Sequence, residues 1–227
     1  MTERGFLISF EGNEGSGKST QLRLLAQRLK SEHYRVIENV EPGGTHIGRE
    51  IRRILLDPAN HDITPLAELL LMFASRAQAA AQVIAPALEQ RAIILTDRFT
   101  DASVAYQGEA RGVGVETVHK LHQLILGSLI PDLTLCIELD LALSLARARH
   151  RNSGASSSRD VETRFDEQSL AFHWRVREGY HRIAREEPER FKIVDGSGNP
   201  DAVSQRVWSV VEPVLRNAPA TKLVQVL

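Results

Sequence analysis

The sequence predicts an α/β protein built on a five-stranded parallel β-sheet flanked by helices. Two observations lead to this prediction. Short apolar segments alternate with longer segments whose apolar residues recur at helical spacing, as in strands joined by helical crossovers. A glycine-rich turn also follows the first apolar segment directly and opens the first helical segment. The chain has 227 residues, 42% of them hydrophobic, and we expect a single domain over residues 1–216 followed by a tail at 217–227.

The five predicted strands are short and mostly apolar. The segment 92–96 is apolar until its last residue, as a central strand of a parallel sheet should be. The glycine-containing turn at 41–44 closes the segment before it, which marks that segment as a second short strand. The strands are predicted at 5–10, 34–40, 92–96, 133–139 and 191–194.

Helical periodicity and capping residues predict the segments between the strands. Thr45 is suited to cap a helix that ends near Leu56, and Pro65 suits the first turn of a long helix. We expect that long helix to kink or break around Pro86. The other predicted helices cover 21–30, a stretch ending at 107, a segment after the glycine-containing loop 108–114 that ends near 126, 142–149, and a last segment ending at 215.

Composition excludes several classes of function. The net charge of −1 provides no overall positive field for nucleic acid or an anionic membrane, so we expect neither as a partner. The beginning of the sequence does not resemble a signal peptide, and we identify no apolar run that we expect to cross a bilayer. The single cysteine, Cys136, lies in an apolar run and is expected in the core. A cytoplasmic enzyme is the resulting expectation.

The glycine-rich turn fits the spacing G-x-x-x-x-G-K-[ST] of a phosphate-binding loop, or P-loop. Its glycines let successive backbone N–H groups point at phosphate oxygens. Lys18 adds a positive charge near the outer phosphates, and the Ser19 hydroxyl is suited to ligate Mg²⁺. The residues predicted to bind ATP are Gly12, Asn13, Glu14, Gly15, Ser16, Gly17, Lys18, Ser19 and Thr20.

The carboxyl edge of the predicted sheet collects further polar residues. Glu41 and the pair Asp97–Arg98 follow predicted strands directly, so they fall at the same edge as the P-loop, where ligands of such sheets bind. A basic, serine-rich segment at about 150–163 follows the helix after the fourth strand. We interpret it as a short lid that closes over phosphates rather than as a solvated linker. The arginines within this segment or next to it are Arg147, Arg149, Arg151, Arg159 and Arg164.

Four segments in order resemble the bacterial thymidylate kinases, over about residues 6–211. They are 11–20, 41–45, 69–78, and Asp97–Arg98 with Ser103 and 105–107. The resemblance implies a P-loop nucleoside monophosphate kinase fold with a short lid. It also implies phosphoryl transfer from MgATP to dTMP, giving dTDP and ADP, usually in a homodimer. Two alternatives stay open: a kinase for another monophosphate such as dCMP or dGMP, and a nucleotide-dependent switch without catalysis.

The resemblance also implies residue roles. Glu14 would bind the deoxyribose 3′-hydroxyl, and Tyr106 would lie against the sugar. Lys18, Arg98, Asp97 and Arg151 would be catalytic, with Arg159 and Arg164 as substitutes for Arg151, and Asp97 would share Mg²⁺ with Ser19. Arg76 and Arg98 would hold the phosphate of the acceptor, with help from Arg52. Ser103 and Gln107 would bind the thymine edge, and Met72 or Phe73 would contact the base. The residues expected to bind the acceptor are therefore Glu14, Arg52, Met72, Phe73, Arg76, Arg98, Ser103, Tyr106 and Gln107.

A structural explanation competes for several of these residues. Asp97 could cap a helix, and the arginines, Arg52 above all, could form surface ion pairs. Tyr106 and Met72 could be core residues, because aromatic and thioether side chains at helical spacing are frequently buried.

Overall fold

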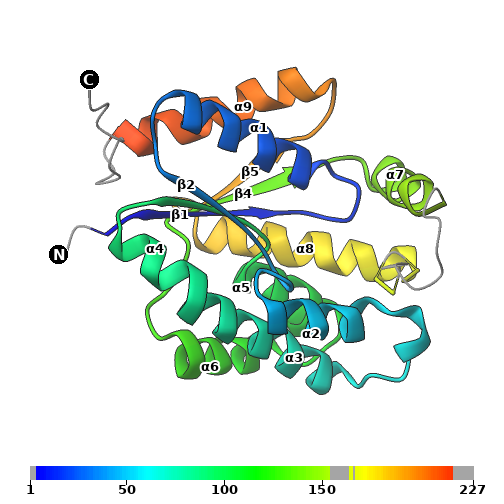
Figure 1. The fold of residues 1–227 in the computed structure, drawn as a ribbon. Coiled ribbons are helices and arrows are strands. Elements are labelled where there is room, and N and C mark those ends of the chain that lie inside the picture. Colours follow the sequence, from blue (N-terminus) through cyan, green and yellow to red (C-terminus); the bar gives the residue numbers. More distant parts are fainter. Residues whose placement is uncertain (1–3, 154–163, 166, 217–227) are drawn as a thin grey trace.

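A five-stranded parallel sheet forms the centre of the computed structural model, which describes residues 4–153, 164–165 and 167–216 (Figure 1). The strand order is β2-β3-β1-β4-β5, so β1 is the central strand, with β3 and β2 on one side and β4 and β5 on the other. All four strand pairs are parallel. The strands are β1 (Phe6–Glu11), β2 (Val36–Val40), β3 (Ile93–Asp97), β4 (Leu133–Glu138) and β5 (Phe191–Asp195).

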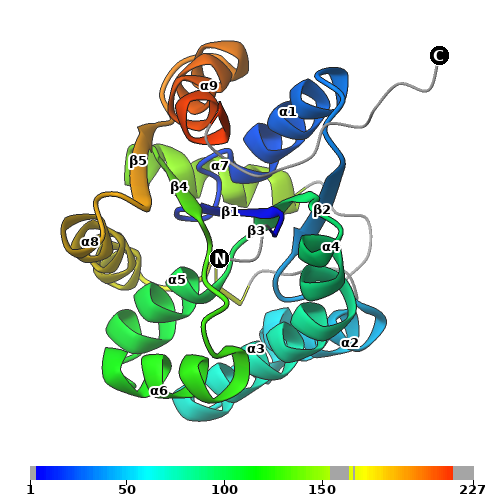
Figure 2. The same ribbon diagram turned by 90° about the vertical axis from the view of Figure 1, so that its left-hand side faces the viewer.

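Helices cover both faces of this sheet (Figures 1 and 2). Helices α1 (Lys18–Ser31) and α9 (Pro200–Arg216) lie on one face. The other face carries α8 (Leu170–Glu186) and a larger helical layer. That layer consists of α2 (His46–Leu56), α3 (Pro65–Ala79), α4 (Ala85–Glu89), α5 (Thr100–Ser103) and α6 (Val115–Leu126), with the 3-10 turn η1 (Pro58–Asn60) and the π-helical segments η2 (Ala80–Ile84) and η3 (Val104–Ala110).

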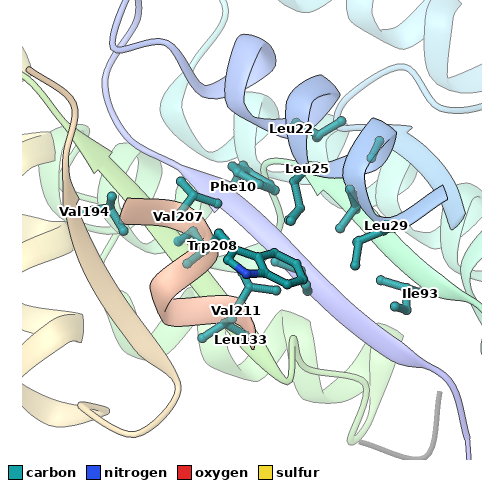
Figure 3. Packing of buried hydrophobic residues seen from close by; sticks show 14 of the residues in the cluster. Phe10, Leu22, Leu25, Leu29, Ile93, Leu133, Val194, Val207, Trp208 and Val211 are labelled. Carbon is teal, nitrogen blue, oxygen red and sulfur yellow. The ribbon is translucent and has the colours of Figure 1, made fainter. Parts of the chain in front are cut away.

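The core between α1, α9 and the sheet fixes the helix that begins at the P-loop. Leucines repeat along one face of α1, and Trp208 of α9 packs into the same cluster as β1 (Figure 3). Burying a leucine side chain contributes about 1.5–3 kcal/mol. The cluster therefore holds the first turn of α1 firmly at the carboxyl edge of the sheet. The labelled members are Phe10, Leu22, Leu25, Leu29, Ile93, Leu133, Val194, Val207, Trp208 and Val211.

The predicted capping and breaking signals are confirmed. Thr45 caps α2 by accepting a hydrogen bond from the Gly48 N–H at 2.9 Å. Helix α3 begins at Pro65. The break expected around Pro86 is the π-helical segment η2, which ends two residues before this proline. All five strands lie where the sequence predicts them, within two residues at each end.

Two segments differ from the sequence prediction. Helix α8 was not predicted, although Phe172, Val176, Tyr180 and Ile183 recur at helical spacing and are buried. Charged residues between them lower the mean hydropathy and mask the pattern. Residues 108–110 were expected in a loop but continue η3, because Gly108 lets η3 pack closely against Val115 of α6.

The helical run Pro65–Glu89 is the one stretch of the described residues long and apolar enough to cross a membrane by length and composition. This run differs from our expectation that no segment qualifies. Two of its charged residues nevertheless form buried ion pairs inside the fold, Glu68 with Arg164 and Arg76 with Glu41. Residues Leu69 and Phe73 of the same run are 0% exposed. The run is therefore a core helix of the helical layer.

Candidate active site

A pocket of about 760 Å³ opens at the carboxyl edge of the sheet. Its walls come from the P-loop, the turn after β2, helix α3, the end of β3, and the segments α5 and η3. Helix α7 (Leu141–Ser153) contributes Arg147. Polar residues from segments far apart in the sequence thus meet in one cavity. The predicted site residues that line it are Glu14, Gly15, Gly17, Lys18, Ser19, Thr20, Arg52, Met72, Arg76, Asp97, Arg98, Ser103, Tyr106 and Gln107.

The P-loop backbone requires its glycines. Gly12, Gly15 and Gly17 have φ angles of 130°, 74° and 103°, a region that residues with a Cβ rarely adopt. A Cβ on Gly15 would also lie 2.0 Å from the Ser144 carbonyl oxygen of α7. The loop can therefore pass directly beneath α7, and α1 starts with its N–H groups facing the pocket, as an anion site needs.

Lys18 is buried within this loop. Its Nζ donates to the Gly12 and Asn13 carbonyls at 3.0 and 2.9 Å. Burial, and next the nearby charge of Arg98, lower the pKa of Lys18 to about 8. A bound phosphate would replace these carbonyl partners with a full negative charge, which favours the protonated amine. Lys18 is thus placed to respond to an anion in the loop.

Ser19 and Asp97 meet at the mouth of the loop. The Ser19 Oγ donates to Asp97 Oδ2 at 2.6 Å. A hydroxyl and a carboxylate are oxygen ligands of the kind that Mg²⁺ prefers, and such sites use one or two protein ligands together with nucleotide phosphates. The pair therefore fits the proposed Mg²⁺ ligands. The capping alternative for Asp97 has no support, because α5 begins at Thr100 with Phe99 as its N-cap and no side-chain cap.

Glu14 joins the P-loop to the opposite wall of the pocket. Arg98 Nη2 donates to Glu14 Oε1 at 2.6 Å, and the Tyr106 hydroxyl donates to Glu14 Oε2 at 2.7 Å. Burial alone would raise the pKa of Glu14, but Arg98 and then Lys18 outweigh it, so this pKa lies below its ordinary value. The carboxylate is therefore ionised and retains acceptor capacity for a further donor.

A second arginine lies deeper in the same wall. Arg76 is 2% exposed and donates from Nε to Glu41 at 2.5 Å and from Nη1 to Ser103 at 3.1 Å. Gln107 donates its amide to Glu68 at 2.8 Å. These bonds fix the orientation of Arg76, Ser103 and Gln107 before any ligand enters, which lowers the cost of ordering them on binding.

The structure places the side chains of Tyr106, Met72 and Phe73 in different surroundings. Tyr106 is 4% exposed and belongs to the core beneath the pocket, yet its hydroxyl reaches Glu14. Met72 lines the pocket, whereas Phe73 is 0% exposed and packs in the core of the helical layer. The expectation that Phe73 contacts a ligand is therefore corrected. The α3 side chain that faces the pocket is Met72, because residues adjacent on a helix point about 100° apart.

The arginines expected to assist in binding or transferring phosphate lie in different places. Arg52 lines the pocket and donates to the Pro42 carbonyl at 2.9 Å. Arg164 is 5% exposed and donates to Glu68 at 2.6 Å and to the Leu55 carbonyl. This buried ion pair makes Arg164 part of the core, so it is no longer a substitute for Arg151. The side chain of Arg151, Arg159 and the segment 154–163 of the expected lid lie outside the described residues.

Asn13 and Ser16, both predicted from the loop motif, do not line this pocket. The Asn13 amide instead donates to the His173 carbonyl of α8 at 3.2 Å, and Ser16 is 3% exposed. Gly12 and Asn13 border a second, much smaller pocket. The Asn13 side chain therefore ties the loop to α8.

Sequence reasoning assigned no role to three residues that organise the site. Glu41 and Glu68 orient Arg76 and Gln107, and Tyr180 of α8 donates its hydroxyl to Glu11 and accepts from Arg98 Nη1. Glu41 was placed at the carboxyl edge from its position after β2, a signal sufficient to suspect it. Nothing local marks Glu68 or Tyr180, because their partners are distant in the sequence.

The fold and this pocket together define a P-loop kinase of the nucleoside monophosphate class: a parallel sheet, a phosphate-binding loop, and a second cluster of arginines facing it. A family model described as thymidylate kinase matches residues 10–207. The chain therefore belongs to the thymidylate kinase family. It is a dTMP kinase, a transferase that converts dTMP to dTDP in nucleotide biosynthesis.

Individual relatives agree with this assignment. The thymidylate kinase of Pelobacter propionicus is 49% identical over 213 residues, which cover 94% of this chain and 95% of the relative. That of Syntrophotalea carbinolica is 49% identical over 203 residues, covering 89% and 93%. The crystal structure of thymidylate kinase from Ehrlichia chaffeensis, 30% identical, superimposes with a TM-score of 0.73 and covers 92% and 98% of the two chains. The alternatives, a dCMP or dGMP kinase or a switch, are not favoured.

Proposed function

We propose that the chain transfers the γ-phosphoryl group of MgATP to dTMP and that the P-loop contributes to both nucleotide sites. The observation that carries this proposal is the Glu14 carboxylate, which belongs to the P-loop but is bound by Arg98 and Tyr106 across the pocket. A carboxylate repels phosphates, so its position in an anion-binding loop needs another purpose. Accepting a hydrogen bond from the 3′-hydroxyl of the acceptor provides one.

The donor side supplies charge neutralisation. The P-loop N–H groups and Lys18 would hold the β- and γ-phosphates, and Ser19 with Asp97 would hold Mg²⁺, which would supply further neutralisation of the phosphate charge. Little covalent chemistry is required of the protein, so aligned nucleotides and fixed positive charges account for most of the rate. The hydroxyl of Ser19 and the carboxylate of Asp97, joined by a hydrogen bond of 2.6 Å, lie side by side at the mouth of the loop.

The acceptor side supplies recognition. Arg98 and Arg76 bind the phosphate of dTMP, with Arg52 at the pocket wall. Ser103 and Gln107, oriented by Arg76 and Glu68, bind the polar edge of thymine, and Met72 packs against the base. Tyr106 lies against the deoxyribose and leaves no space for a 2′-hydroxyl. An unpaired buried polar group costs about 1–3 kcal/mol, enough to discriminate between bases.

The lid remains part of the proposal. Arg147 of α7 lines the pocket, which supports a position of this helix beside the bound phosphates. We keep Arg151 as the residue that stabilises the migrating charge, in the manner of an arginine finger. Arg151→Ala should lower kcat and leave the KM for dTMP almost unchanged. Arg159→Ala tests the remaining substitute in the same assay. If both variants keep kcat within a few-fold of the wild type, the lid only covers the site.

A panel of acceptors tests the reaction itself. ADP formation is measured with MgATP and, in turn, dTMP, dCMP, dGMP and the ribose form of the acceptor. We expect dTMP to give the highest kcat/KM, by about tenfold or more for each mismatched polar group. Equal rates with dTMP and dCMP would refute the assignment of Ser103 and Gln107. ADP formation that no acceptor accelerates would refute the proposed transfer.

We further propose a single kinase domain over residues 1–216 that works in the cytoplasm as a homodimer. Helices α2 and α3 pack against each other, and each exposes large apolar side chains. Ile47, Ile54, Leu66 and Leu70 are 47–50% exposed. A second copy of the chain would cover these residues, and the homodimer of the family that the sequence resembles supports this occupant.

A further inference from the structure

Arg98 holds an unusual backbone conformation at the end of β3. Its φ angle is 70°, which places a residue with a long side chain in the left-handed region. Three hydrogen bonds fix this turn. The Arg98 N–H donates to the Phe10 carbonyl at 2.9 Å, Thr96 Oγ1 donates to the Arg98 carbonyl at 2.9 Å, and the Phe99 N–H donates to Glu11 Oε1 at 2.8 Å.

The Arg98 guanidinium is fixed as firmly as its backbone. Nη2 donates to Glu14 at 2.6 Å and to the Tyr106 hydroxyl at 3.1 Å, while Nη1 donates to the Tyr180 hydroxyl at 3.1 Å. Glu14 and Tyr106 belong to the acceptor site already described. Tyr180 is buried and does not line the pocket, so its hydroxyl contacts Arg98 from the protein interior.

Glu11 connects both sets of bonds. It is 0% exposed, and its Oε2 accepts from the Tyr180 hydroxyl at 2.9 Å while its Oε1 accepts from Phe99 N–H and from Ser9 Oγ at 2.8 Å each. One buried carboxylate therefore supports the strained turn that carries Arg98 and orients the tyrosine that holds its guanidinium. The carboxylate lies at the end of β1, directly before the P-loop.

Helix packing brings Tyr180 close enough to take part. Gly179 faces η3, where a Cβ would lie 2.9 Å from the Ala105 Cα. Only a residue without a side chain lets α8 approach this closely. The rings of Tyr180 and Tyr106 consequently meet edge to face at 6.4 Å, with both hydroxyls on the same guanidinium.

We propose that Glu11 and Tyr180 are positioning residues of the kinase reaction, which set the direction in which Arg98 presents its guanidinium to the acceptor phosphate. This inference rests on the proposed role of Arg98. Neither residue needs to touch a nucleotide. Their effect is exerted through Arg98 and should vanish when the Arg98 side chain is absent.

A double-mutant cycle tests the inference. Tyr180→Phe removes one hydroxyl, and we expect kcat/KM for dTMP to fall about 3- to 10-fold with the KM for ATP unchanged. In an Arg98→Ala background, the same change should alter kcat/KM less than twofold. The assay is run at pH 8, where Glu11, with a pKa of about 7, is mainly ionised. Glu11→Gln, which keeps the side-chain shape, should give the same pattern of dependence on Arg98.

Control measurements separate the alternatives. Tyr34→Phe removes the same atom just before β2, at the end of that strand remote from the pocket, and should leave kcat/KM unchanged. Thermal melting checks that each variant is folded. An equal loss from Tyr180→Phe with and without Arg98 would overturn the inference in favour of a general structural role, as would no loss at all. If Arg98→Ala alone leaves kcat/KM for dTMP unchanged, the proposed role of Arg98 fails first and the positioning role fails with it.

Discussion

Lys18 and Glu14 lie in one loop, carry opposite charges and bond different partners. Lys18 bonds only backbone carbonyls in the described structure, while Glu14 bonds Arg98 and Tyr106 across the pocket. The loop motif alone predicts the role of Lys18. The partner of Glu14 is 84 residues away in the sequence, so only the folded sheet reveals that contact.

Lys18→Ala should abolish phosphoryl transfer while leaving dTMP binding largely intact. Removing a preorganised charge from the transition state costs about 3–4 kcal/mol, a loss of about 10²–10³ in kcat. Steady-state kinetics and calorimetric titration with dTMP measure the two quantities. Turnover at the wild-type rate would contradict the P-loop assignment.

Glu11 should make stability depend on pH. Burial, and next the neighbouring Asp101, raise its pKa from 4.5 to about 7, although Arg98, Ser9 and the Phe99 N–H act in the opposite direction. A group whose pKa is higher in the folded state stabilises fully below its unfolded pKa and loses that contribution as pH rises through the folded pKa. The contribution of Glu11 therefore falls between about pH 4.5 and pH 7, by about 3 kcal/mol at most.

The comparison of wild type with Glu11→Gln isolates this contribution. Urea unfolding is measured at pH 5 and at pH 8 for both proteins. Relative to the wild type, we expect the variant to gain stability as the pH rises, because glutamine does not titrate. A difference between the two proteins that is the same at both pH values would contradict the raised pKa of Glu11.

At the scale of elements, α8 connects the two halves of the site. It packs against η3, supplies Tyr180 to the Arg98 network and accepts a hydrogen bond from Asn13 at the His173 carbonyl. Periodicity predicted the other long helices because their apolar residues stand out from their surroundings. The apolar face of α8 is interrupted by arginines and glutamates, so its pattern became clear only with the packing in view.

Gly179→Ala should push α8 away from η3. Alanine gains about 1 kcal/mol of helix propensity over glycine, but its Cβ would lie 2.9 Å from the Ala105 Cα. Overpacking of this kind costs about 1–3 kcal/mol, so we expect a net loss of about 1 kcal/mol in the free energy of unfolding. We also expect a lower kcat/KM for dTMP.

Glu178→Ala is the matched control, because Glu178 is the adjacent residue of the same helix and its side chain is 63% exposed. It should change stability by no more than about 0.5 kcal/mol. Chemical denaturation of both variants decides the point. A Gly179→Ala variant more stable than the wild type would show that α8 has room to spare at this position.

At the scale of the whole molecule, the strand order places the P-loop in the middle of the sheet. β1 has β3 on one side and β4 on the other. Residues that follow β1, β2 and β3 converge on one pocket, and Arg147 of α7, the helix after β4, joins them. Alternating strands and helices predicted this edge in advance. The ion pairs behind the pocket were not predictable, because Arg76 finds Glu41 at a distance of 35 residues and Arg164 finds Glu68 at 96.

The proposed dimer surface offers a separate test. Leu66 and Leu70 of α3 are 50% and 47% exposed. Replacing both with glutamate would place charges in an apolar interface and should convert a dimer to a monomer in analytical ultracentrifugation. The same changes at Leu143, an exposed leucine of α7, serve as the control. A wild type that sediments as a monomer at micromolar concentration would refute the dimer.

The proposed reaction depends on Glu14, which would bind the acceptor from within the loop that holds the donor. The most direct measurement compares wild type and Glu14→Gln with two acceptors, dTMP and its 3′-deoxy analogue, at saturating MgATP. We expect Glu14→Gln to lower kcat/KM for dTMP about 10- to 100-fold, to affect the analogue much less, and to leave the KM for ATP within about twofold. An equal loss with both acceptors, or a loss confined to the KM for ATP, would contradict the proposed contact between Glu14 and the 3′-hydroxyl.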